Sequence, residues 1–359
     1  MDRTEGVGPI ATRLAGVDTD LARADWYRSL SKYEKPHLAK ATWQLLNTFV
    51  PYIALWTLMV GMLHRGVSYA FVLPLAILAA GLLVRIFIFF HDGCHGSFFA
   101  SRRANRILGY VCGILTFTPY EDWRRPHAEH HATTGNLERR GVGDIWTLTV
   151  EEYLARPRWV RFAYRFFRNP LFLFVVAPMF MFLIVQRFPH KRAGKRERSS
   201  VTLTNVAILL VVALASLTIG LRTYLLIQIP IITVAGSIGM WLFYVQHQFE
   251  PVYWAHQPQW NPMSAALAGS SYYKLPKVLQ WFSGNIGLHH IHHLRPRIPN
   301  YNLQQCYNEV HILQAVETLT LGRSLRSMFL HLWDESQQKL VSFRSARRYA
   351  RQIAQQKST

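Results

Sequence analysis

Residues 287–294 have the sequence Gly-Leu-His-His-Ile-His-His-Leu, and this stretch constrains the fold of the whole chain. It places four imidazoles within five positions, which ordinary packing does not explain. In a helix, His289, His292 and His293 occur at i, i+3 and i+4 and project from one face, whereas His290 points roughly a quarter-turn away. Imidazole nitrogens on one face are suitable metal ligands, so the stretch predicts a metal site.

Similar histidine spacings occur twice more in the chain. The pattern H-x-x-H-H recurs at His127, His130 and His131, and a shorter H-x-x-x-H pair occurs at His91 and His95. Packed imidazoles without a metal would be destabilised by desolvation and, once protonated, by like-charge repulsion. Three such clusters therefore indicate more than one metal ion.

The composition indicates a membrane protein. The 359 residues are 50% hydrophobic and carry 40 Lys and Arg against 20 Asp and Glu, a formal charge of +20. Basic residues flank apolar runs, which is typical of contact with anionic lipids and argues against a nucleic-acid-binding protein. The three cysteines are too scattered for a zinc ribbon or an iron–sulfur cluster, so the metal ligands have to be histidines.

Four apolar segments have about the 20 residues that the hydrocarbon core of a bilayer requires. They are residues 43–63, 69–90, 201–220 and 224–245. Residues 107–119 and 171–186 are shorter, and we expect re-entrant or interfacial segments there, the second a hairpin bent at Pro178. The predicted fold is an all-α polytopic membrane protein with about four transmembrane helices and a cytoplasmic helical cap. We expect a single domain, residues 1–359, with a cytoplasmic N-terminal arm (1–42), a core (43–300) and a basic cytoplasmic C-terminal region (301–359), whose tip we expect to be disordered.

Charge sets the orientation. The segment 187–198 holds six Lys and Arg, and the positive-inside rule places such a loop in the cytoplasm. With four crossings, we expect every histidine cluster to face the cytoplasm. If 171–186 also crossed, the third cluster would lie on the opposite side from the first two, and no shared metal site could form.

Some local features carry further expectations. Arg85, inside the second apolar segment, is expected to snorkel to the membrane interface, and Pro126 to lie in the first turn of a new helix. Residues 157–169 interleave Arg with aromatic residues and predict a surface helix on anionic headgroups. Residues 21–38 predict either a second surface helix or a polar arm.

Several residues near the clusters are candidates for the metal site. His247 ends the fourth apolar segment, as the first cluster ends the second, so it is a candidate ligand. Asp92, Asp144, Glu250 and Asn285 are candidates for orienting a ligating ring from outside the ligand shell.

The number of histidines bears on the metal. The candidate ligands make nine imidazoles, enough for two metal ions, whereas zinc usually takes four ligands and has no redox chemistry. An iron pair can activate dioxygen, and ligands at span ends suit a lipid chain that enters an apolar tunnel from the bilayer. The nine ligand candidates are His91, His95, His127, His130, His131, His247, His289, His292 and His293.

Residues 91–97 (HDGCHGS), 123–131 (WRRPHAEHH) and 284–294 (GNIGLHHIHHL) resemble the three histidine boxes of the membrane fatty acid desaturase family. Residues 143–153 (GDIWTLTVEEY) and 245–250 (VQHQFE) resemble the bacterial acyl-lipid omega-6 (delta-12) desaturases. The resemblance implies insertion of a cis double bond into an oleoyl-type chain by a non-haem di-iron centre with O2 and two electrons. It also implies that the nine histidines are the iron ligands. In the first box the usual order Asp-Cys-Gly is changed to Asp-Gly-Cys.

Two other function classes stay open at this point. A related di-iron hydroxylase or ketolase of lipids, alkanes or carotenoids would have similar boxes. A metal transporter or sensor would place ligands at mid-membrane rather than at span ends. Because the chain has no evident haem-binding domain and no cluster of cysteines, its electrons are expected from an external donor such as a ferredoxin or a cytochrome, docked on the basic face.

Overall fold

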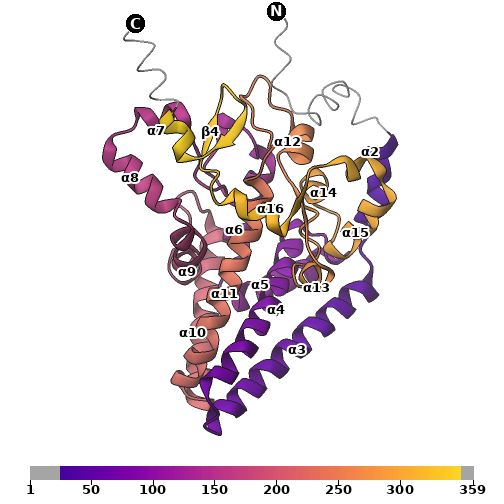
Figure 1. Cartoon of the computed structure of the whole chain (residues 1–359). Helices are drawn as coiled ribbons and strands as arrows, with labels where there is room; N and C mark the ends of the chain where they lie inside the picture. Colours follow the sequence, from indigo (N-terminus) through magenta and orange to yellow (C-terminus); the bar gives the residue numbers. More distant parts are fainter. Residues whose placement is uncertain (1–24, 349–359) are drawn as a thin grey trace, which may run out of the picture.

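The computed structural model describes residues 25–348, and residues 1–24 and 349–359 lie outside it. Figure 1 shows a bundle of long helices that carries a cap of shorter helices and loops. Within the predicted N-terminal surface helix, α2 (Asp25–Ser29) and η1 (Leu30–Glu34) are described. The side chains of Leu30 and Tyr33 are buried against the cap rather than turned toward lipid. The expected disorder of the C-terminal tip concerns residues outside the described part of the chain.

Four helices are long and apolar enough to cross a membrane, as predicted. They pair into two hairpins, and both hairpin turns lie at the end of the bundle away from the cap (Figure 1). The turns are joined side by side, because His64 Nε2 lies 3.1 Å from the carbonyl of Ile219 and the Tyr69 hydroxyl donates to the carbonyl of Leu226 at 2.9 Å. The four helices are α3 (Leu38–His64), α4 (Tyr69–His95), α10 (Lys195–Thr218) and α11 (Leu221–His247).

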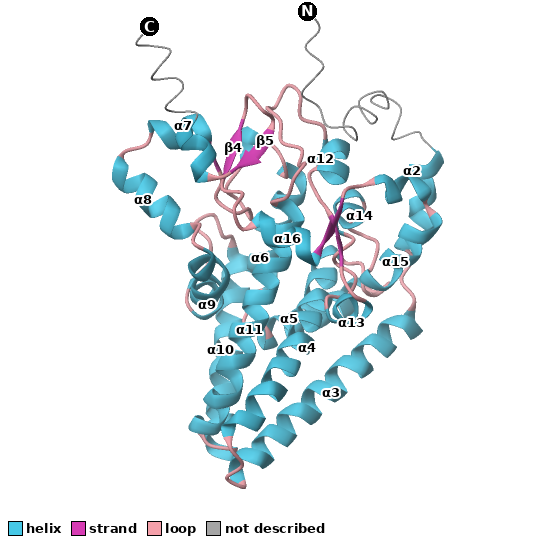
Figure 2. Ribbon diagram, in the orientation of Figure 1, coloured by secondary structure: helices cyan, strands magenta, loops and turns pink. Residues whose placement is uncertain are grey.

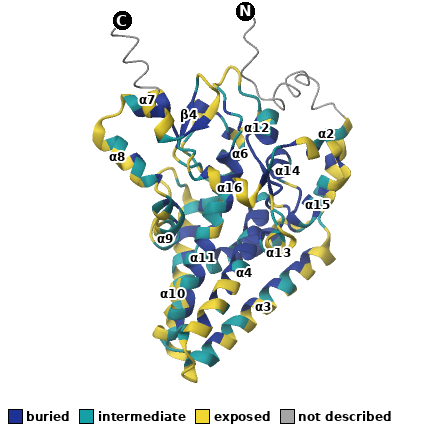
Figure 3. Cartoon of the chain, viewed as in Figure 1, coloured by how far each residue is buried: buried dark blue, intermediate teal, exposed yellow. Residues whose placement is uncertain are grey.

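Helices α4 and α11 form the centre of the bundle. In their most apolar stretches 56% and 39% of the residues are buried, compared with 17% in α3 and 11% in α10. Figure 3 shows the exposed residues along α3 and the lower ends of the long helices. Ala76, Ala79 and Ala80 of α4 have no exposed surface, and such small residues let helices approach closely. The first histidine box and His247 lie at the ends of these two central helices.

The end of α4 is set by glycine. Gly96 follows His95 with φ +67°, a left-handed conformation that ends helices and favours glycine. At Gly93 a Cβ atom would lie 3.0 Å from the carbonyl oxygen of Asn105 in the neighbouring helix α5 (Arg102–Leu115). The altered Gly93-Cys94 order thus places the glycine where α5 approaches most closely.

The two short apolar segments are helical but lie differently. Helix α5 covers the first of them and packs against α4 and α6 (Tyr120–Thr133). The second segment follows helix α8 (Arg158–Phe167), and its helical run from Phe172 to Arg187 is bent from α8 by 61°. The bend therefore lies before Phe172. The prediction of a hairpin bent at Pro178 is wrong, because the chain stays helical on both sides of this proline. The run consists of η3 (Phe172–Val176), α9 (Ala177–Leu183) and η4 (Val185–Arg187).

Two local predictions are wrong. Pro126 does not begin a helix, because α6 already starts at Tyr120 and accommodates the proline in its interior. Arg85 does not snorkel: it is 3% exposed, and its Nε donates to Thr48 Oγ1 at 3.0 Å. Its guanidinium lies 4.3 Å from the ring centroid of Trp281 and donates to the carbonyl of the same residue. Trp281 of the cap covers the guanidinium of Arg85 and keeps it from extending to the membrane interface.

The remaining elements form the cap, in which Figure 2 shows all the strands. Strand β1 (Leu148–Thr149) pairs in parallel with β4 (Leu332–Asp334), and β4 pairs antiparallel with β5 (Lys339–Val341). Strand β2 (Tyr272–Lys274) pairs in parallel with β3 (Thr318–Thr320). The all-α class is confirmed, and the strands, of two or three residues each, tie the C-terminal region to segments near the histidines. The cap elements are η2 (Leu137–Arg139), β1 (Leu148–Thr149), α7 (Val150–Ala155), α12 (Pro262–Ala268), β2 (Tyr272–Lys274), α13 (Lys277–Phe282), α14 (His289–Leu294), α15 (Asn300–Glu309), η5 (His311–Ala315), β3 (Thr318–Thr320), α16 (Leu321–Ser327), β4 (Leu332–Asp334) and β5 (Lys339–Val341).

Candidate metal centre

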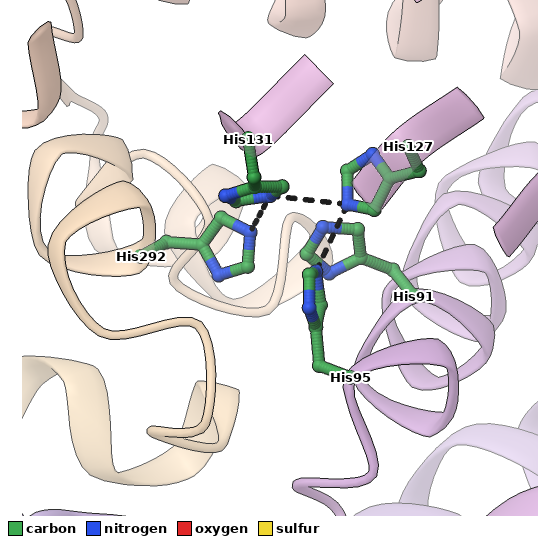
Figure 4. Close-up of side chains that lie close together, drawn as sticks. All are labelled: His91, His95, His127, His131 and His292. Atoms are coloured by element: carbon green, nitrogen blue, oxygen red, sulfur yellow. Dashed lines mark hydrogen bonds between the residues drawn. The ribbon is translucent and has the colours of Figure 1, made fainter. Parts of the chain in front are cut away.

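Histidines from α4, α6, α11 and α14 meet where the bundle joins the cap. They form two groups, and within each group the candidate ligand atoms all lie within 4.8 Å of one another. Figure 4 shows the rings of the larger group directed toward a common space. All nine predicted ligands belong to one of the two groups. The five-histidine group is His91, His95, His127, His131 and His292, and the four-histidine group is His130, His247, His289 and His293.

Helical periodicity divides each H-x-x-H-H box between the two groups. In α6, His127 and His131 are separated by four residues and share the five-histidine group, whereas His130 points to the other group. Helix α14 does the reverse, because His289 and His293 share the four-histidine group and the intervening His292 joins the five. Each of these helices therefore contributes histidines to both groups, so each group needs both the second and the third box.

The ring nitrogens are spaced as ligands of one ion would be. In the five-histidine group, Nε2 of His127 lies 2.9 Å from that of His95 and 3.2 Å from that of His131. In the four-histidine group, Nε2 of His247 lies 3.2 Å from that of His130 and 3.0 Å from that of His289. Two nitrogens bound at about 2.1 Å to one ion and at right angles to each other would be about 3.0 Å apart.

Five histidines of α6 and α14 are kept neutral by their surroundings. Burial is the main cause, and the neighbouring imidazoles add to it. Together they lower the pKa of His127, His131, His289, His292 and His293 well below the usual range. A neutral imidazole has a free lone pair, which is the form that binds a metal ion.

Two rings of the four-histidine group have partners for their second nitrogen. His130 Nδ1 lies 2.6 Å from Oδ1 of Asp144, as expected for an orienting carboxylate. His247 Nδ1 lies 3.2 Å from the carbonyl oxygen of Gly269, which follows α12. These contacts fix which nitrogen of each ring carries hydrogen and leave Nε2 free to face the group.

Three other predicted orienting residues have different contacts. Asp92 lies 3.6 Å from His91 Nδ1, but its hydrogen bonds come from Asn300. Asn285 donates to the carbonyl of Asn300 and not to a histidine. Glu250 accepts a hydrogen bond from the backbone of Leu340, and burial raises its pKa to about 7. The hydrogen bonds shown for Asn285 and Glu250 are thus to residues outside the two groups, and their role beside a ligating ring stays a prediction.

One histidine of the third box lies outside both groups, and three neighbouring residues were not predicted. His290 points away from both groups, with Nε2 3.1 Å from the carbonyl of Leu313, as the helical spacing indicated. The indole of Trp123 stacks on His127 with ring centroids 4.2 Å apart, and its i−4 position could have revealed it. No sequence pattern indicated the contact of the Gly269 carbonyl with His247 or that of Asn300 with Asp92, because both residues are brought to the site by tertiary packing.

The donor set is compatible with a metal site. Both groups consist entirely of imidazoles, which suit iron, copper and zinc. A protein site for zinc usually stops at four ligands, whereas the larger group offers five nitrogens within one small space. The two groups could therefore hold two metal ions, and iron is among the metals that imidazole ligands suit.

Comparison with known proteins identifies the family. The sequence model of the family described as "Fatty acid desaturase" matches residues 67–315, which include all nine histidines. The chain belongs to the fatty acid desaturase family. A fatty acid desaturase from Bacillus subtilis is 48% identical over 318 residues, covering 89% of this chain and 90% of the relative. The resemblance drawn from the histidine boxes is therefore confirmed.

More distant members of the family differ in the position they desaturate. An sn-1 oleoyl-lipid 12-desaturase from Synechocystis is 26% identical, covering 69% of this chain and 71% of the relative. An omega-3 fatty acid desaturase of the endoplasmic reticulum from Vigna radiata is 27% identical, covering 61% of this chain and 59% of the relative. Family membership together with the four apolar helices makes this desaturase an integral membrane oxidoreductase.

Proposed function

We propose that this desaturase inserts a cis double bond at the delta-12 (omega-6) position of an oleoyl chain carried by a lipid. The observation that supports the proposal most is the convergence of nine imidazoles in two groups at the cap-side ends of α4 and α11. An acyl chain that enters from the bilayer would reach the two groups from that end of the helices. The similarity to the oleoyl-lipid 12-desaturase of Synechocystis supports the position of the double bond.

The proposed cofactor is a non-haem di-iron centre held by the nine histidines. When bound, an iron pair supplies the activation of dioxygen. Overall, two hydrogens leave the acyl chain, and O2 with two further electrons and two protons becomes two waters. Helices α6 and α14 each contribute imidazoles to both groups. Asp144 keeps hydrogen on Nδ1 of His130, and Trp123 covers one ring of the larger group.

We propose that the electrons come from an acidic donor protein, such as a ferredoxin, or from a cytochrome. A basic rim follows η4, and it is anchored to the helix of the second box because His190 Nδ1 lies 2.6 Å from Oδ2 of Asp122 in α6. Exposed cations in the rim are Lys191, Arg192, Lys195 and Arg196. Complementary charge would raise the association rate and make turnover with the donor fall as salt increases.

The same charges support an orientation in which the histidines face the cytoplasm of a bacterial inner membrane. Both hairpin turns would then lie on the outer side, because they are at the opposite end of the bundle from the cap. A cysteine placed at exposed Gly66 in the first turn should be labelled from outside intact cells by a membrane-impermeant maleimide, whereas one placed at exposed Lys191 should not. Labelling of position 191 alone would reverse the orientation.

The activity is tested by expressing the chain in a host that makes oleoyl lipids but no polyunsaturated ones. Mass spectrometry should find a new double bond at the delta-12 position of lipid-bound 18-carbon chains. A His292→Ala variant should make no product while still reaching the membrane. A hydroxylated chain would identify a hydroxylase, a double bond nearer the methyl end would identify an omega-3 desaturase, and product from the variant would overturn the ligand assignment.

A further inference from the structure

Helix α16 of the C-terminal region turns its small polar residues inward and its apolar residues outward. Ser324 and Ser327 are each 1% exposed, whereas Leu321 is 41%, Leu325 54% and Phe329, in the turn that follows the helix, 62% exposed. A helix that lies between a protein core and water has the opposite pattern. The apolar face of α16, formed by these last three residues, therefore indicates contact with an apolar environment outside the chain.

The inward side of α16 is held in place by hydrogen bonds. Ser324 Oγ donates to the carbonyl of Leu321 at 2.7 Å and lies 3.1 Å from the hydroxyl of Tyr273. The backbone carbonyl of Ser327 accepts a hydrogen bond from the hydroxyl of Tyr244 in α11 at 2.9 Å. These contacts fix the rotation of α16 about its own axis, so its apolar face stays directed outward.

Helix α16 lies at the depth where α11 leaves the membrane, and Figure 1 shows it at the junction of the long helices and the cap. Tyr244, which bonds to Ser327, is three residues before His247, and Trp241, whose Nε1 donates to Tyr273 at 3.2 Å, is six residues before it. At 1.5 Å per residue these contacts lie about 5–9 Å before the end of α11. Trp and Tyr at such a helix end are typical of the boundary between acyl chains and headgroups.

The charges of α16 are separated from its apolar face. At about 100° per residue, the three apolar residues lie within about 80° of one another, whereas Arg326 and Arg323 lie about 140° and 200° from Leu321. Both arginines are exposed, and Arg323 forms an ion pair with Glu317 at 2.6 Å. A helix in the plane of a membrane has this arrangement, with apolar side chains among the acyl chains and cations among the headgroups.

A neighbouring helix also exposes an apolar face. Trp159, Phe162 and Phe166 of α8 are more than half exposed and share one side of that helix. Phe329, after α16, and Pro170, after α8, line the same hollow. The exposed apolar surface of α16 thus continues toward α8, for which the sequence predicts contact with the membrane surface. Figure 3 shows exposed residues on both helices.

We propose that α16 is a membrane-surface helix whose apolar face inserts among the acyl chains of the cap-side leaflet, with Arg323 and Arg326 at the level of the headgroups. The partner of this face is lipid and not a protein, because α16 packs beside the membrane-exit end of α11 at the depth of Trp241 and Tyr244. The C-terminal region therefore anchors the cap to the bilayer, next to the helix end that carries His247.

The test measures how a nitroxide label on α16 is placed in a bilayer, and it needs no enzyme activity. The full chain, one copy in each phosphatidylcholine nanodisc, carries the label on Leu325→Cys. The three native cysteines are buried, so the unmodified chain measures the background. Because O2 concentrates among acyl chains and a polar nickel chelate stays in water, the ratio of collisions with O2 to collisions with nickel should be high.

Two control positions calibrate this ratio. Arg326→Cys is the next residue of the same helix but lies about 100° around its axis, and its label should give a lower ratio than the label at position 325. Lys339→Cys lies in β5, on the side of the cap away from the bundle (Figure 2), and its label should give a ratio several-fold lower than the label at position 325.

With one chain in each disc and no other protein, only lipid can shield a label from the nickel chelate and leave it open to O2. If the label at position 325 met nickel as often as the label at position 339, the apolar face would lie in water or await a protein partner, and the proposal would be overturned. A label at position 325 that was shielded from both reagents would lie inside the protein, which would equally overturn it.

Discussion

Asp92 of α4 accepts two hydrogen bonds from Asn300, one from its backbone nitrogen and one from its side-chain amide, both at 2.8 Å to the same carboxylate oxygen. Asn300 has no exposed surface, and its own Oδ1 accepts from Gln44 of α3 at 2.9 Å. This pair joins the first histidine box, the first transmembrane helix and the segment that follows the third box. It also places a carboxylate at the first turn of α15, where it stabilises the helix.

Replacing Asp92 by Ala leaves both donors of Asn300 buried and unpaired. We expect a loss of about 2–4 kcal/mol in the free energy of unfolding, since each orphaned donor costs roughly 1–3 kcal/mol. Asp92→Asn keeps an acceptor oxygen and should lose less than half of that amount. Denaturant unfolding in detergent measures both, and equal stability of Asp92→Ala and the unmodified chain would contradict the role of this pair.

Two single substitutions, one in each histidine group, should each remove the metal ion of that group only. His131→Ala should lower the iron content from about two to about one per chain, and His293→Ala should do the same from the other group. Iron is measured by mass spectrometry on protein purified without oxygen. The control is His290→Asn, a neighbouring position in α14 whose side chain faces the Leu313 carbonyl, and it should keep both ions.

Asp144 should affect metal retention more than fold stability. Asp144→Ala removes the carboxylate from His130 Nδ1, and loss of such a partner typically weakens metal binding about 10–100-fold. Asp144→Asn can still accept the hydrogen bond and should weaken it less. Competition with a chelator measures the affinity, while the melting temperature of the metal-free chain should change little. Unchanged iron affinity in Asp144→Ala would show that this hydrogen bond does not contribute to metal binding.

Glu250 should make stability depend on pH. Burial raises its pKa to about 7, so the native state favours the protonated form and the unfolded chain ionises first. Stability should therefore fall as pH rises from about 4.5 to about 7. Glu250→Gln keeps an acceptor for the Leu340 backbone and should flatten this part of the profile. The melting temperature of both proteins across pH 5–8 provides the measurement, and parallel profiles would contradict the assignment.

The transmembrane helices were predictable because a bilayer requires about 20 apolar residues, a local property of the sequence. The nine histidines were predictable for a similar reason, since i, i+4 spacing is read directly along the chain. Their division into two groups was only partly predictable. Helical spacing separates His130 from His127 and His131, but which histidines of α4, α11 and α14 meet each side of α6 depends on tertiary packing, which no local pattern encodes.

Three charged residues have contacts that differ from the expected ones for a common physical cause. Arg85 and Arg168 were placed at the membrane surface from the residues around them, yet Trp281 and Leu330 arrive from far along the chain and bury them. Glu250 lies three positions after His247, but the end of α11 turns it toward the β5 strand instead. Charged side chains near a helix end are thus assigned reliably only once the cap that covers that end is known.

The contrast between the central and peripheral transmembrane helices has a consequence for how this desaturase meets changes in its membrane. A thinner, thicker or stiffer bilayer should act first on α3 and α10, which are the least buried of the four long helices, and tilting of these two helices can absorb the mismatch. The nine histidines lie on the more buried helices α4 and α11 and on α6 and α14, so such tilting should change the distances between their rings little. The metal site can thus keep one geometry while the thickness and stiffness of the surrounding lipid vary.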